Sequence, residues 1–156
     1  MLLRQRLRID MEELVEALKK VQATSFSFYL KAHNYHWNVE GHSFSEYHTF
    51  LGTLYTEVFD AVDDIAEHIR TLDAYVPGSL TRFQQLSSIE DELGVPTSRM
   101  MMAKLFADNQ RVITDLISAH RIAEAAGRRG IVNFLEGRID VHDKHSWMLR
   151  SFTKGE

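Results

Sequence analysis

Residues 33–67 read HNYHWNVEGHSFSEYHTFLGTLYTEVFDAVDDIAE, and the rest of the chain is organised around them. They hold two histidines twelve positions apart, His36 and His48. They also hold two carboxylates four positions apart, Asp63 and Glu67. Imidazole nitrogens and carboxylate oxygens are ligands that first-row transition metals take in proteins. The stretch therefore indicates a metal site.

Apolar residues at helical spacing continue from this stretch in both directions. A capping box, Asp10 with Glu13, predicts the start of one helix, and Ser43 with Glu46 predicts the start of the next. The predicted helices cover 10–38, 43–72, 80–86, 98–126 and 130–153. Four long helices joined by short, long and short connections predict an all-α four-helix bundle, with a short extra helix in the connection between the second and third long helices.

The bulk composition limits the class of protein. A length of 156 residues predicts a single domain. No apolar run is long enough to cross a bilayer and no secretory signal follows Met1, so we expect a cytoplasmic protein with no membrane partner. The absence of cysteine excludes disulfides and thiolate metal sites. A formal net charge of −4 argues against non-specific binding of nucleic acid by the whole surface.

The carboxylates allow two interpretations. Asp60, Asp63, Asp64 and Glu67 fall within about 100° of one another on a helical wheel. On their own they are more simply a solvated acidic face. Metal binding is the other interpretation, because a cation would relieve the repulsion between four neighbouring acids.

The histidines belong to the ends of two helices joined by a short turn, so the rings of His36 and His48 can converge. Trp37 is either a core residue, which we favour, or an oxidisable neighbour of a redox metal. The remaining histidines are interpreted as surface or structural residues, with His33 and His42 as weaker candidates for secondary metal contacts.

The histidines and the acids cannot meet within one chain. From His48 to Asp63 is fifteen residues of helix, or about 22 Å, whereas metal–ligand bonds are about 2 Å. A shared site therefore requires a second, antiparallel copy of this helix. A two-fold dimer contains such a copy and would form two identical sites, each with the histidines of one chain and the acids of the other. The alternative is that the two halves are unrelated. No glutamate is followed by histidine three positions later, which argues against the di-iron centre of ordinary bundles.

At these positions the chain resembles the Dps family, the miniferritins of the ferritin-like superfamily. The resemblance rests on the segments Asn34–Val39, Asp63–Glu67, Leu86–Ile89 and Lys144–Arg150, together with Gly41, Phe44 and His48. It covers nearly the whole chain.

The resemblance implies a ferritin-like homododecamer, a hollow shell that stores ferric mineral and protects against oxidative stress. It implies that Fe(II) is oxidised at two-fold interfaces, usually by hydrogen peroxide. His36 and His48 would bind iron from one subunit, and Asp63 and Glu67 from its partner. Zn or another divalent metal is a candidate for the same site, and Trp37, Asp60 and Asp64 are candidate auxiliary residues.

The chain also departs from the family pattern. Thr49 and Gly52 stand where many relatives carry acids, and Glu57, Asp60 or Asp64 are candidates to replace them. Arg128, Arg129 and Asn133 stand where relatives often line an iron-entry pore with acids.

DNA binding, with nucleoid association, is the weaker alternative function. The lysine-rich tail of some relatives is missing, and alternation over residues 1–9 predicts an extended arm carrying only Arg4, Arg6 and Arg8. A plain helical oligomer with no metal is the third hypothesis.

Overall fold

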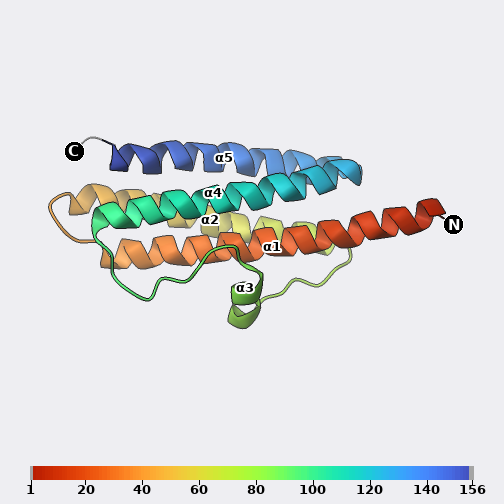
Figure 1. Cartoon of the computed structure of the whole chain (residues 1–156), viewed down its shortest axis with the longest axis horizontal. Coiled ribbons are helices and arrows are strands. Elements are labelled where there is room, and N and C mark those ends of the chain that lie inside the picture. Colours follow the sequence, from red (N-terminus) through yellow and green to blue (C-terminus); the bar gives the residue numbers. More distant parts are fainter. Residues whose placement is uncertain (1, 155–156) are drawn as a thin grey trace.

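The computed structural model describes residues 2–154, with the side chains of residues 11–154. Its helices are α1 (Leu2–Asn38), α2 (Phe44–Thr71), α3 (Leu80–Leu86), α4 (Ser98–Ala125) and α5 (Arg129–Thr153), and the described residues contain no strand. Figure 1 shows four long helices in a bundle with α3 set beside α1. This confirms the all-α four-helix bundle with a short extra helix.

The long connection between α2 and α4 determines the topology. α2 and α4 run in the same direction, and α1 and α5 run against them (Figure 1). The connection is tied to the bundle by hydrogen bonds to Asp115 on α4, which accepts from Thr24 on α1 at 2.8 Å and from Ser88 in the connection at 2.7 Å. It is also tied by Glu92, which accepts from Tyr35 on α1 at 2.7 Å.

The first predicted boundary is wrong. α1 begins at Leu2, so residues 2–9 continue the helix in place of an extended arm, and Asp10 lies inside the helix, where it cannot cap it. Leucine and arginine are good helix formers, and adding residues to an existing helix is much easier than nucleating one. Met1 lies outside the described residues.

The other boundaries agree closely with the prediction. α3 covers 80–86 as expected, and the Thr97 hydroxyl caps α4 by accepting a hydrogen bond from the backbone N–H of Met100 at 3.3 Å. Ser43 occupies the N-cap position of α2, but its side chain makes no capping hydrogen bond. The short turn before α2 therefore does not depend on the predicted capping box.

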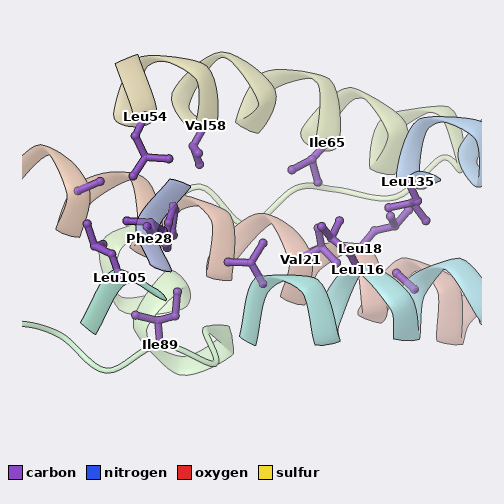
Figure 2. Close-up of a cluster of buried hydrophobic side chains, with 14 of the residues drawn as sticks. Leu18, Val21, Phe28, Leu54, Val58, Ile65, Ile89, Leu105, Leu116 and Leu135 are labelled. Atoms are coloured by element: carbon purple, nitrogen blue, oxygen red, sulfur yellow. The ribbon is translucent and has the colours of Figure 1, made fainter. Parts of the chain in front are cut away.

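The core lies along the centre of the bundle and draws on every long helix. Figure 2 shows Phe28 of α1, Leu54 of α2, Leu105 of α4 and Leu135 of α5, all fully buried or nearly so. Burial of each such side chain contributes about 1.5–3 kcal/mol. Ile89 brings the long connection into the same cluster. No helix among residues 2–154 is both long and apolar enough to cross a membrane.

Candidate metal site

The turn between α1 and α2 brings His36 and His48 together. Their rings are stacked, with centroids 3.8 Å apart and planes 20° apart. The Nδ1 of His36 lies 2.8 Å from the backbone oxygen of His48, and the Nδ1 of His48 lies 2.9 Å from the backbone oxygen of His36. The predicted convergence of the two histidines is therefore confirmed.

These reciprocal contacts determine which nitrogen of each ring can bind a metal. A carbonyl oxygen only accepts hydrogen bonds, so both Nδ1 atoms must donate. In the neutral rings the lone pair is then on Nε2, and neither Nε2 atom has a hydrogen-bond partner among the described side chains of residues 11–154. A backbone carbonyl that holds the second nitrogen of a histidine is the usual outer-shell support of a metal ligand.

Two glycines allow this arrangement. Gly41 has a φ of +114°, a left-handed conformation that favours glycine, and it reverses the chain between α1 and α2. Gly52 lies one turn after His48, and a Cβ atom there would come within 3.2 Å of Cε1 of His36. Gly52 therefore provides the space that the His36 ring fills.

Trp37 is not a core residue, contrary to the interpretation favoured above. Its side chain is 62% exposed, because α1 ends one residue later and the indole lies on the outer side of the last turn. The Trp37 ring lies 3.9 Å from the ring of His33, which stacks on Tyr55 at 3.8 Å. Burial and the neighbouring His36 lower the pKa of His33.

Aromatic side chains continue from Trp37 where α1 and α2 pack together. Tyr55 is followed by Tyr29, with ring centroids 6.3 Å apart, and Tyr29 by Phe59, 4.9 Å away. We call Trp37, His33, Tyr55, Tyr29 and Phe59 the aromatic stripe. Phe59 is 51% exposed and lies one helical turn before Asp63. The aromatic stripe thus connects the histidine pair to the acidic part of α2.

The acids lie on the exposed face of α2, far from the histidines of the same chain. Asp60, Asp63, Asp64 and Glu67 are all exposed. α2 is unbroken from Phe44 to Thr71, so the distance of about 22 Å between His48 and Asp63 applies. Among the side chains of residues 11–154, no group of three or more histidines, aspartates or glutamates is placed to hold a metal. The joint assignment of His36, His48, Asp63 and Glu67 to one site stays a prediction.

Glu57 is not available to replace a missing acid near the histidines. It accepts hydrogen bonds from Arg138 and from Nε2 of His145, the latter at 2.8 Å. Burial raises the pKa of Glu57, but these hydrogen bonds and charges outweigh that effect and hold it at about 2. Sequence reasoning missed Arg138 as a partner, and the one signal was Asn109, which interrupts the apolar stripe of α4 and belongs to the same polar cluster.

Of the remaining histidines, His42 is exposed in the turn before α2, whereas His142, His120 and His68 contact other side chains. His142 is buried against Asn109, and His120 contacts Glu136 at 3.1 Å. His68 is half-buried against Phe134. Arg128, Arg129 and Asn133 are exposed at the start of α5.

Residues 15–155 match the ferritin-like domain. An uncharacterized low temperature-induced protein of Nostoc is 32% identical over 145 residues, which cover 92% of this chain and 81% of that protein. DNA protection during starvation protein 2 of Bacillus anthracis is 28% identical over 90% of this chain and 97% of its own length. These relatives match almost the whole bundle.

Solved structures agree in fold. Dps from Thermosynechococcus elongatus superposes with a TM-score of 0.93 at 25% identity, covering 97% of this chain and 96% of that one. Dps from Staphylococcus aureus superposes with a TM-score of 0.89 at 29% identity, covering 93% and 97%. A Dps protein from Vibrio cholerae, at 25% identity, a TM-score of 0.89 and coverage of 94% and 92%, is described as a member of the ferritin-like diiron-carboxylate proteins.

The chain therefore belongs to the Dps miniferritins, within the ferritin-like proteins. Membership supports iron storage and protection against oxidative stress as its general role.

Proposed function

We propose that this chain is the subunit of a ferroxidase that oxidises Fe(II) with hydrogen peroxide at two-fold interfaces and stores the ferric product inside a cytoplasmic dodecameric shell. The observation that carries the proposal is the histidine pair. Its backbone contacts leave both Nε2 atoms available, while the acids that would complete the site lie out of reach on the same chain.

The chemistry suits these ligands. Neutral imidazoles and carboxylates bind Fe(II) and tolerate the harder Fe(III), and a small ligand set leaves positions open for peroxide. Two Fe(II) ions and one H₂O₂, with two protons, give two Fe(III) ions and two waters. Both electrons reach the peroxide together, so the O–O bond breaks without release of hydroxyl radical. His36 and His48 would hold iron, and Asp63 and Glu67 would balance the charge of Fe(III).

The aromatic stripe supports a partner chain at this face. It leaves Trp37 and Phe59 more than half exposed between the two halves of the site, and exposed apolar patches of this kind mark protein interfaces. In an antiparallel two-fold pairing that places His48 opposite Asp63 and Glu67, the symmetry axis crosses α2 near Thr56. Thr56 is exposed on the same face.

Mixed assemblies test whether the site is shared. The double variants His36→Gly with His48→Gly and Asp63→Asn with Glu67→Gln should each be nearly inactive. When the two are unfolded together and reassembled, each mixed dimer regains one of its two sites, because the intact histidines of one chain meet the intact acids of the other. Ferric formation after addition of Fe(II) and peroxide is measured by absorbance. Mixed assemblies as inactive as the parents would overturn the shared site.

A single cysteine tests the position of the axis. The chain has no cysteine, so Thr56→Cys introduces the sole thiol. Residues nearest a two-fold axis face their own copies, and a disulfide needs Cα atoms within about 7 Å. We expect oxidation to crosslink Thr56→Cys into covalent dimers and to leave a control, Thr114→Cys on α4, as monomers on a denaturing gel.

A further inference from the structure

A second set of metal-type ligands lies inside the bundle, between α2 and α5. Arg138 is 8% exposed, and its guanidinium donates to both carboxylate oxygens of Glu57. Its NH2 nitrogen lies 3.1 Å from Nε2 of His142. Glu57 also accepts from Nε2 of His145 at 2.8 Å. The guanidinium thus contacts one carboxylate and one imidazole, and a second imidazole contacts the same carboxylate.

The hydrogen-bond roles in this cluster are fixed by Asn109. Its Nδ2 donates to the backbone oxygen of His142 at 2.8 Å and to the hydroxyl of Ser146 at 2.7 Å. Its Oδ1 is therefore the acceptor for Nδ1 of His142, 2.6 Å away. The Nε2 of His142 then carries a lone pair that points at the guanidinium. Burial lowers the pKa of His142, in agreement with a neutral ring.

Two imidazole nitrogens with one carboxylate form a recognised ligand set for a divalent transition metal. The guanidinium supplies the positive charge that such a metal would supply, but it is planar and much larger than an ion. It lies between the carboxylate of Glu57 and Nε2 of His142, while His145 contacts the same carboxylate from another direction. Among the side chains of residues 11–154, no three are placed to bind a metal. We propose that Arg138 occupies a latent divalent-metal site formed by Glu57, His142 and His145, and that it thereby excludes metal from the bundle core.

The competing explanation is a buried ion pair with no relation to metal. The two explanations predict different effects when Arg138 is lost. Loss of Arg138 from a simple ion pair leaves an uncompensated carboxylate and lowers stability. Loss of Arg138 from a latent metal site also creates affinity for a divalent cation. The inference does not depend on the interface site, because the Glu57, His142 and His145 donors belong to a single chain.

The test uses the assembled protein with Asp63→Asn and Glu67→Gln, which removes the acidic half of the interface site. In this background Arg138→Gln is compared with Arg138→Lys, which keeps the cation, during titration with Co²⁺. We expect Arg138→Gln to bind one more Co²⁺ per chain than Arg138→Lys, with the visible absorption of nitrogen and oxygen ligands. Adding Glu57→Gln should abolish the extra ion.

Equal Co²⁺ binding by folded Arg138→Gln and Arg138→Lys would overturn the inference. If Arg138→Gln does not fold alone, it and Arg138→Leu are refolded with and without Co²⁺ and followed by circular dichroism. Recovery of helix only with Co²⁺ supports the latent site. Failure of both variants to recover with Co²⁺ overturns it.

Discussion

The chain contains two groups of histidines with opposite properties, a partly exposed pair at the turn between α1 and α2 and a buried pair beside Glu57 and Arg138. At the turn between α1 and α2, His36 and His48 donate from Nδ1 to each other's backbone and leave Nε2 available. In the core, His142 uses both ring nitrogens, and the Nε2 of His145 is taken by Glu57. The comparison shows that the same residue type can have its ring nitrogens occupied or available, depending on its surroundings. What matters is which lone pairs the fold leaves without a partner.

The largest effect is expected when the exposed cluster is removed. His36→Gly with His48→Gly takes away both nitrogen ligands, and we expect peroxide-dependent oxidation of Fe(II) to slow by more than about tenfold, since even outer-shell changes at metal sites cost roughly that much. His120→Gly, on α4, serves as the histidine control and should oxidise iron at the normal rate. If the double variant matches the unchanged protein, the ligand assignment is wrong.

Substitutions in the core cluster around Arg138 should lower the free energy of unfolding. Arg138→Met leaves the half-buried carboxylate of Glu57 without its guanidinium partner and with the imidazole of His145 as its remaining contact. Breaking a buried ion pair in this way typically costs about 3–5 kcal/mol in the free energy of unfolding. Arg138→Met combined with Glu57→Met removes both charges and should recover most of the loss. Urea unfolding of the three proteins measures this. A double variant no more stable than Arg138→Met would contradict the pairing.

Acid should weaken the same cluster within a defined pH range. The pKa of Glu57 is about 2 in the folded protein against an ordinary value of 4.5, so the unfolded chain takes up its proton first as the pH falls. The contribution of Glu57 to stability is therefore complete above about pH 4.5 and is lost as the pH approaches 2. Glu57→Gln should flatten the decline of the melting temperature between pH 5 and pH 2, whereas Glu136→Gln at an exposed position should change it little.

The smallest effect is expected from filling the space that Gly52 leaves beside the ring of His36. Gly52→Ala places a methyl group about where a Cβ would lie 3.2 Å from the His36 ring, which must shift by a few tenths of an ångström. We expect oxidation of Fe(II) to slow a few-fold, while the helix gains up to about 1 kcal/mol in stability. Gly137→Ala on α5 meets no atom within 4 Å and should give the stability gain without the loss of rate.

The fold could be predicted from sequence because helical spacing and turn residues are local signals. α3 covers the predicted residues 80–86. The extended arm was wrong because alternation over residues 2–9 is also compatible with a helix that simply continues backwards from residue 10. Trp37 was wrongly assigned to the core. A helical wheel gives the direction in which a side chain points, but it does not show whether another helix covers that side chain at the end of its own helix.

The contacts of the histidine pair could be predicted from the sequence, whereas those of the cluster around Arg138 could not. The histidine pair joins residues twelve positions apart across one short turn, so its geometry follows from the local structure. The Arg138 cluster joins α2, α4 and α5, and its pairing depends on how these helices pack. Asn109 in an apolar stripe signalled a buried polar partner without identifying it. Whether the acids of α2 meet the histidines depends on how two copies of the chain pack together, and local sequence patterns do not determine that packing.

The reciprocal backbone contacts of His36 and His48 also join two helices. Each ring donates to the backbone oxygen of the other residue, so the last turn of α1 and the beginning of α2 are fixed to each other from both sides. The two rings therefore keep their places through contacts within the turn itself. A ligand that binds to both rings would meet donors already in position, with no rearrangement of the turn beforehand.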